Sequence, residues 1–222
     1  TIKHETIYYP NKIKQIVGRL NTQNLSEEEE RENVEAISEL IEYYKGIFTI
    51  LSSCAARQLE EVTFRRSTIS VADLCEYAVK YFRKASKGKT SRIEFLTEST
   101  EKRIIGDINQ LRFLLENLID EALTVREDGI LKLHAAEDGN YIRFLFTDTR
   151  REKSVDELNK LFYPNLARMT SGEKGELRGT EYLICKQIIR DHDEFAGRRG
   201  CRINAEPAQE GGFTVYFTLP KR

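Results

Sequence analysis

Apolar side chains recur at helical spacing throughout residues 1–66. Ile13, Ile16, Val17 and Leu20 recur at a spacing of three to four positions, so they share one face of a helix. After a polar break, Ser26 and Glu29 form a capping box, which is typical of a helix N-terminus. A second stripe then continues for about six helical turns and consists of Ile37, Leu40, Ile41, Tyr44, Ile47, Phe48, Leu51, Ala55 and Leu59. The pattern predicts a long antiparallel helical hairpin over residues 1–66.

A stripe of this length on two helices cannot be covered by the hairpin alone. We therefore expect the hairpin to pack on a second copy and form a four-helix bundle, which would make the protein a homodimer. The alternative is that the stripe packs against the rest of the same chain. The sequence leaves both arrangements open.

From about residue 67 the pattern changes, and helical segments alternate with strands. In the most regular part, Leu131, Leu133, Ile142 and Phe144 alternate with other residues on two strands that flank a turn. In order, the pattern predicts a helix over 70–81, a strand over 92–96, a helix over 107–125, a hairpin with its turn at 137–140, a long loop over 149–174 with a short helix at 155–161, a helix over 179–191 and two final strands. Residues 67–222 are thus predicted to form an α+β domain, a two-layer α/β sandwich with helices on one face of a mixed sheet.

Charge and composition narrow the range of partners. The 35 basic and 36 acidic residues nearly cancel, which gives no global field for nucleic acid or an anionic membrane. The sequence has no apolar run of about 18 residues, so membrane contact would need a segment outside this chain. The four cysteines lack the paired spacing of a zinc site. We interpret them as reduced structural residues, which favours a cytoplasmic compartment.

The order of these elements resembles the transmitter module of a two-component sensor histidine kinase. The resemblance is firmest in three stretches, residues 107–122 (DINQLRFLLENLIDEA), 183–192 (LICKQIIRDH) and 211–220 (GGFTVYFTLP). It implies a dimerisation and phosphoacceptor hairpin at 1–66 and a histidine kinase-like ATP-binding domain at 67–222. An ATPase of the same superfamily but another class, such as a chaperone or a gyrase, is disfavoured because those lack a preceding long hairpin.

The first of these stretches is similar to the helix in which the kinases hold magnesium through an asparagine. Asn117 matches an asparagine of that motif, but the magnesium position itself falls on Glu121. A carboxylate is a suitable hard oxygen ligand, yet without the metal it would repel phosphate. The alternative for Asn117 is a helix-packing role beside the apolar stripe.

Two further nucleotide motifs are only partly kept. The adenine-binding aspartate of the family corresponds to Asp148, at the end of a predicted strand, but both glycines that normally follow it are lost. An aspartate there could equally cap a turn. The phosphate loop keeps one glycine of three, Gly179, while Glu181 brings a negative charge to the place of the phosphates. An ordinary loop-to-helix glycine is the simpler interpretation of Gly179.

His4 resembles the phosphoacceptor histidine of the kinases, and Glu5 resembles the acid that orients it. In that motif a neutral imidazole nitrogen attacks the γ-phosphorus, and a proline follows shortly. Here Pro10 follows later than usual. His4 is equally well explained as a surface residue. His192 matches a histidine near the end of the last helix and is assigned a structural role.

Two hypotheses about function follow. In the first, the protein is an active ATP-dependent autophosphorylating histidine kinase. In the second, which the lost glycines and misplaced carboxylates favour, it is a pseudokinase, a dimeric scaffold or phosphorelay partner that binds ATP and magnesium weakly or not at all. Both place it in two-component signalling, with a response-regulator receiver domain as the implied partner and no nucleic acid. Both also allow it to be the cytoplasmic part of a membrane-anchored sensor, whose anchor would precede Thr1.

Overall fold

The computed structural model describes residues 2–22, 25–41, 64–163, 170–171, 177–178 and 181–222. The chain divides into two compact units. The first consists of residues 1–61 and 164–180, and the second of residues 62–163 and 181–222.

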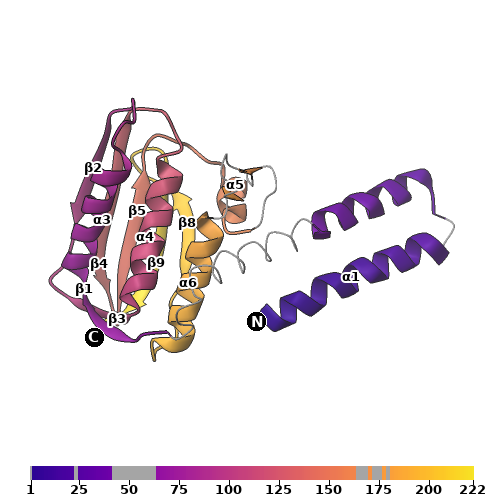
Figure 1. The fold of residues 1–222 in the computed structure, drawn as a ribbon, viewed down its shortest axis with the longest axis horizontal. Coiled ribbons are helices and arrows are strands. Elements are labelled where there is room, and N and C mark those ends of the chain that lie inside the picture. The colour runs from indigo at the N-terminus through magenta and orange to yellow at the C-terminus, as the bar shows by residue number, and fades with distance from the viewer. Residues whose placement is uncertain (1, 23–24, 42–63, 164–169, 172–176, 179–180) are drawn as a thin grey trace. The chain divides into compact units, whose positions relative to one another are not determined.

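The first unit is helical over most of its described length. Helix α1 spans Ile2–Thr22, and residues 27–41 form a second helix (Figure 1). The predicted capping box is present, since Glu29 N donates to Ser26 Oγ (3.3 Å) and Ser26 N donates to Glu29 Oε2 (2.9 Å). Short strands β6 (Thr170–Ser171) and β7 (Leu177–Arg178) pair antiparallel. None of the described helices combines the length and the hydropathy that crossing a membrane requires.

The apolar stripes of this unit stay partly uncovered where the structure describes them. Ile16 is buried, but Val17, Val34 and Ile41 are exposed. The continuation of the second stripe, from Tyr44 to Leu59, lies outside the described residues. The four-helix bundle therefore stays a prediction.

The second unit is built on a five-stranded mixed sheet with the order β2-β4-β5-β9-β8. Its strands are β2 (Ile93–Glu98), β4 (Gly129–Asp138), β5 (Tyr141–Asp148), β8 (Ile203–Pro207) and β9 (Phe213–Pro220). Strands β2 and β4 are parallel, and the other pairs are antiparallel. A small antiparallel pair, β1 (Ser67–Ser70) with β3 (Arg103–Gly106), lies where the chain enters this unit.

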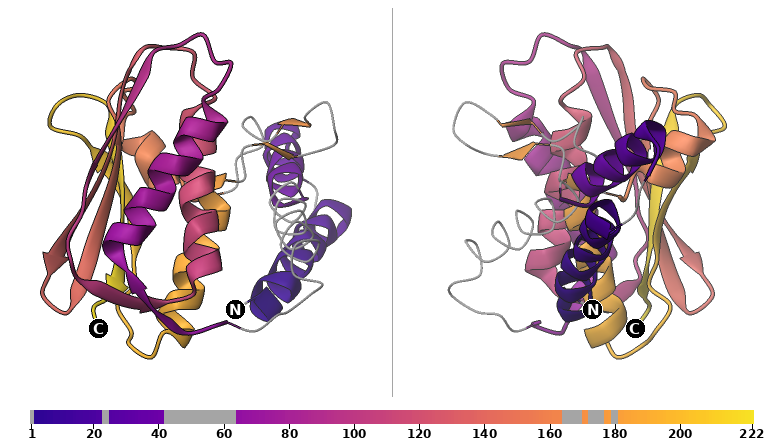
Figure 2. Two further views of the ribbon diagram at one scale, coloured as in Figure 1. Left: turned by 60° about the vertical axis from the view of Figure 1, so that its left-hand side comes forward. Right: turned by 90° about the vertical axis from the view of Figure 1, so that its right-hand side faces the viewer.

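Helices α3 (Val71–Ala85), α4 (Ile108–Ala122) and α6 (Glu181–Phe195) cover one face of this sheet (Figure 2). A short helix, α5 (Val155–Lys160), contacts the edge strand β8. The α+β class and the two-layer sandwich are thereby confirmed. The helices of this unit differ from the prediction mainly at their ends, since α3 extends to Ala85 and α6 extends to Phe195.

The core of the second unit forms where the buried face of the sheet meets the helices. On β5, buried and partly exposed residues alternate strictly, so Ile142, Phe144, Phe146 and Asp148 share the buried face. The rings of Phe144 and the β9 residue Phe217 stack at 4.9 Å. On the helical side of the core, α4 contributes buried side chains that include Leu111, Leu114 and Leu118. On β5 every second residue is buried, and on α4 the buried residues recur every three to four positions. Both spacings match the patterns of apolar residues in the sequence.

We expect Leu114→Ala to reduce the free energy of unfolding by about 2–5 kcal/mol, because it leaves a cavity in a fully packed core. Val155→Ala, at an exposed position of α5, is the control and should change it by no more than about 0.5 kcal/mol. Urea denaturation followed by circular dichroism measures both. Equal stability of the two variants would contradict this account of the core.

Candidate functional site

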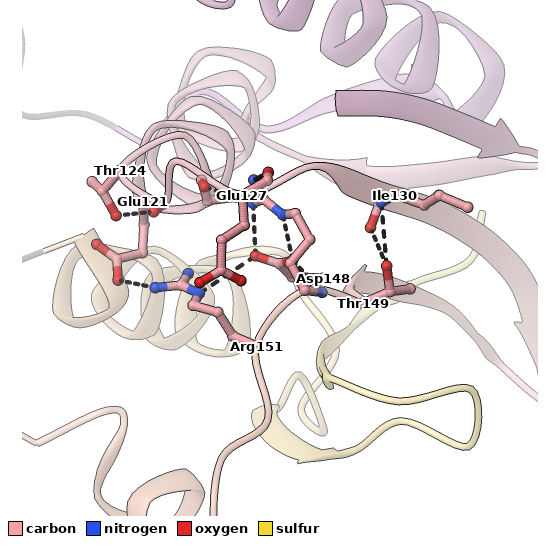
Figure 3. A network of polar contacts seen from close by, with 9 residues as sticks. Glu121, Thr124, Glu127, Ile130, Asp148, Thr149 and Arg151 are labelled. Carbon is pink, nitrogen blue, oxygen red and sulfur yellow. Dashed lines mark hydrogen bonds and ion pairs between the residues drawn. The ribbon is translucent and has the colours of Figure 1, made fainter. Parts of the chain in front are cut away.

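Three of the site residues expected from the sequence lie in one region, at the end of β5 and the C-terminal half of α4. Asp148 is the last residue of β5 and is 1% exposed. Asn117 and Glu121 are buried on α4, one helical turn apart, so they point to the same side. Figure 3 shows Glu121 and Asp148 with Arg151 between them. The structure therefore brings together the residues that the resemblance assigned to magnesium and adenine.

The Asp148 carboxylate is held by the arginine two residues further along the chain. Arg150 donates from Nε to Asp148 Oδ1 (2.8 Å) and from Nη2 to Oδ2 (2.9 Å), a bidentate pair. The backbone N of Arg150 also donates to Oδ1 (3.0 Å). Both side chains are almost completely buried. Each carboxylate oxygen thus already accepts at least one charge-assisted hydrogen bond.

Arg150 also ties the end of α4 to β5. Its Nη2 donates to the carbonyl of Ala122 (2.7 Å), the last residue of α4, and its Nη1 donates to the carbonyl of Glu127 (3.4 Å). Helix C-terminal carbonyls lack partners within the helix, and the Ala122 carbonyl otherwise accepts only a long hydrogen bond from Val125 N (3.4 Å), so the guanidinium supplies its shorter partner. The side chain fits because residue 129 is glycine: a Cβ at Gly129 would overlap Arg150 Cγ.

Arg151 bridges the two carboxylates of the site. Its Nη1 lies 3.7 Å from Glu121 Oε1, and its Nε lies 3.5 Å from Asp148 Oδ2. The guanidinium carbon is 5.8 Å from the centre of the Phe213 ring, within range of a cation–π contact. The resulting network contains two carboxylates and two guanidinium groups, so the charges balance within the site.

The amide of Asn117 is engaged by its own helix. Its Nδ2 donates to the carbonyl of Phe113 (2.7 Å), one turn earlier. This bond agrees with the helix-packing interpretation of Asn117. Within the described part of the chain, no group of three or more His, Cys, Asp or Glu side chains could hold a metal ion. With Glu121 beside Arg151, these side chains do not fit a magnesium ion as they stand.

The remaining candidate residues stay predictions. His4 and Glu5 lie near the start of α1, in a stretch whose side chains are not described, and Gly179 lies outside the described residues. Glu181 is the first residue of α6. Sequence reasoning overlooked Arg150 and Arg151. The only signal was that two arginines lie two and three residues after an aspartate on the buried face of a strand.

Comparisons with known proteins agree with this fold. The family model described as histidine kinase-, DNA gyrase B-, and HSP90-like ATPase matches residues 106–222. The signal transduction histidine-protein kinase BaeS of Escherichia coli (strain K12) is 26% identical over 164 residues, which are 72% of this chain. The chain spans only about a third of that relative, since the match covers 33% of BaeS.

Two solved structures match along the whole chain. Histidine kinase ThkA in complex with the response regulator TrrA gives a TM-score of 0.57 at 18% identity, with 100% of this chain and 60% of that chain covered. Full-length ShkA in complex with AMPPNP gives a TM-score of 0.58 at 18% identity, with 100% and 46% covered. At these identities the likeness concerns the fold.

We expect Asp148→Asn to reduce the free energy of unfolding by roughly 3–5 kcal/mol, because it leaves the buried guanidinium of Arg150 without a counter-charge. Asp156→Asn removes the partner of an exposed ion pair with Lys160 and is the matched control, with stability close to wild type. Urea denaturation at neutral pH measures both. A wild-type value for Asp148→Asn would contradict the central role of the Asp148–Arg150 pair.

Proposed function

Because the chain belongs to the family of histidine kinase-, DNA gyrase B-, and HSP90-like ATPases, we propose that it is a sensor kinase transmitter whose own arginine blocks nucleotide binding. The bidentate contact of Arg150 with Asp148 carries this proposal. In the family that the sequence resembles, the matching aspartate accepts a hydrogen bond from the adenine amino group. Here the guanidinium donates to both oxygens of that carboxylate. The protein would thus be a pseudokinase, in which ATP and magnesium bind weakly or not at all.

The strength of the pair indicates how severe the block is. Removing one partner of a buried ion pair costs roughly 3–5 kcal/mol. At about 1.4 kcal/mol per factor of ten, an adenine that displaced Arg150 would lose roughly two to four orders of magnitude in affinity. Part of this loss could be recovered if Arg150 found other partners after displacement. The block is therefore strong without being absolute.

The phosphate side of the site is unfavourable as well. Burial first, and then the charges of Glu181 and Glu121, raise the pKa of the Cys185 thiol. Burial, together with Glu116 and Glu181, likewise raises the pKa of Asp120. Burial is the larger cause of both shifts, but the part due to Glu181 and Glu121 shows that negative side chains lie near the N-terminus of α6, where the resemblance places the phosphates. An anionic ligand would be repelled there unless a cation accompanied it.

The remaining roles rest on the helical unit and on the relatives. We propose that residues 1–66 form the dimerisation hairpin and that residues 67–222 form the degenerate ATPase-like domain. His4 would receive a phosphoryl group from another protein, with Glu5 orienting the ring. A receiver domain is the proposed partner, by analogy with the ThkA–TrrA complex. We place the protein in the cytoplasm, as a scaffold or phosphorelay partner, either free or attached to a membrane sensor.

The second candidate function is an active autophosphorylating histidine kinase. Asp148 itself is retained at the end of β5, and the similar protein ShkA was solved with the nucleotide analogue AMPPNP. Activity would require Arg150 and Arg151 to leave the two carboxylates when nucleotide arrives. The two candidates therefore differ in one measurable quantity, the affinity of the wild-type chain for MgATP.

We expect Arg150→Gly to bind MgATP at least about tenfold more tightly than the wild-type chain, because it frees Asp148 to accept the adenine amino group. Arg126→Gly makes the same change in a neighbouring exposed loop and should leave the affinity unchanged. MgGTP serves as the ligand control, since guanine carries a carbonyl where adenine carries the amino group. Isothermal titration calorimetry measures the affinity of the wild-type chain, Arg150→Gly and Arg126→Gly for each nucleotide. If Arg150→Gly is unfolded at the temperature of the titration, Arg150→Gln takes its place.

Micromolar binding of MgATP by the wild-type chain would contradict the pseudokinase and favour the active kinase. In that case, acid-labile label from γ-labelled ATP should appear on the wild-type protein and disappear in His4→Gln. Without binding or label, the pseudokinase stands.

We expect the chain to be a dimer in solution, because the helical unit exposes apolar side chains such as Val17 and Ile41. A charged residue at either position should shift the mass measured by light scattering toward the monomer. The exposed Glu35 lies on the same helix as Ile41, and Glu35→Gln is the control. A monomeric wild-type protein would remove the four-helix bundle.

A further inference from the structure

The linker of residues 64–67, which leads from the helical unit into the ATPase-like unit, is fastened to the latter at four points. Arg65 N donates to Asp107 Oδ2 (2.9 Å), and Ser67 Oγ donates to the carbonyl of Gly106 (3.2 Å). The Phe64 ring meets the His192 ring edge-on, with 4.9 Å between the centroids. The guanidinium of Arg66 lies against Gly197. The linker is thus docked where α4 begins and α6 ends.

His192 lies at the centre of this docking site and is 0% exposed. Its Nε2 accepts a hydrogen bond from Asp107 N (3.1 Å), and its Nδ1 faces the carbonyl of Ile188 (2.7 Å). A backbone N–H can only donate and a carbonyl can only accept, so Nδ1 carries the proton and Nε2 does not. The surrounding atoms therefore select the neutral imidazole.

Asp107 forms hydrogen bonds with the linker, with α4 and with His192. Its carboxylate caps α4 by accepting from Asn109 N (2.9 Å) and Gln110 N (3.3 Å), and it also accepts from Arg65 N. Its own N–H is the group that His192 accepts. The imidazole has little room to move, since a Cβ at Gly106 would lie only 2.9 Å from its Nε2 and Cδ2. Asp107 thus connects His192 Nε2 to the linker through two hydrogen bonds.

We propose that this arrangement is a proton-sensitive clamp, in which neutral His192 holds the linker on the ATPase-like unit and protonated His192 releases it. A proton on Nε2 would point an N–H at the N–H of Asp107, and two donors cannot share a hydrogen bond. The ring must then move, which disturbs the residue that anchors Arg65 and caps α4. In acid the linker is held more weakly on the ATPase-like unit, and this release does not depend on nucleotide.

Burial and the charged groups around His192 act in opposite directions on its pKa. The linker contributes Arg65 and Arg66, and the start of α4 contributes Asp107. On α6 itself, Asp191 bonds to Gln187, and Asp193 bonds to Arg199, Gly200 and Cys201. From β3, Gly106, which carries no charge, lies against the ring. Burial lowers the pKa of His192, and the Ile188 carbonyl and Asp107 oppose this shift only in part.

The sign of the pH effect follows from this lowered pKa. A released His192 in water has a pKa of about 6.5, and the clamped form has a lower one. Below about pH 6.5 the released form binds more protons, so acid favours release by at most about tenfold per pH unit. Above that pH the clamp keeps its full strength. Below the clamped pKa the effect saturates.

Hydrogen–deuterium exchange of the full chain between about pH 7.5 and 5.5 tests the clamp, after correction for the intrinsic rate of each amide. We expect protection of residues 65–70 and 107–110 to fall with pH, by up to about tenfold per unit. Peptides from β5 should keep their protection. His192→Gln, which does not titrate, should abolish the pH dependence, whereas His134→Gln, at an exposed histidine paired with Glu98, should not.

Phe64→Ala gives a second, independent variant that leaves the titrating group in place. It should increase exchange in the linker at every pH while the slope with pH persists. Wild-type protection that is constant down to pH 5.5 would overturn the proposal, and so would an unchanged slope in His192→Gln. If His192→Gln does not fold, the proposal stands on the wild-type slope together with that of Phe64→Ala, and it fails if either slope is absent.

Discussion

Asp148 ends β5 on the buried face of that strand, in the same row as Ile142, Phe144 and Phe146. The pleat of the strand gives this position no alternative, because a shift by one residue would expose the aromatic core. A carboxylate in such a place needs hydrogen-bond donors or a cation, since burying it alone would be far too costly. In a kinase of this fold a nucleotide can act as one of the donors. Here Arg150 donates to this carboxylate from two residues away.

This constraint explains why several residues of the site depart from the family motif at the same time. Once residue 150 is an arginine, its side chain needs space, which Gly129 provides, and acceptors, which Asp148 and the end of α4 provide. Arg151 then lies beside Glu121, so a carboxylate at the expected magnesium position is neutralised by the protein itself. Buried ion pairs are weak evidence for added stability. Under the proposed function, the arrangement replaces a ligand by side chains of the protein.

The sequence predicted the parts of this structure that depend on local signals. The β4–β5 hairpin shows strict alternation, and α4 begins at Asp107, whose side chain caps it as expected for an aspartate. Strands β1 and β3 were missed because they are only four residues long and owe their existence to pairing with each other. In the site, Asn117, Glu121 and Asp148 could be found from the motif. Their partners could not, because the contact of Arg151 with Glu121 depends on how α4 and β5 pack.

Helix α4 connects the two networks on which the function of this unit is proposed to depend. Its N-terminal cap, Asp107, holds the linker and His192, and its last carbonyl, at Ala122, accepts from Arg150. A helix of 15 residues is rigid and about 22 Å long, so a displacement at one end is felt at the other. In a kinase, ligand binding at the C-terminal end could report to the linker along this helix. Because Arg150 is proposed to occupy that end in place of nucleotide, we propose that the docking of the linker is the variable that remains, which fits the proposed role of relaying a signal.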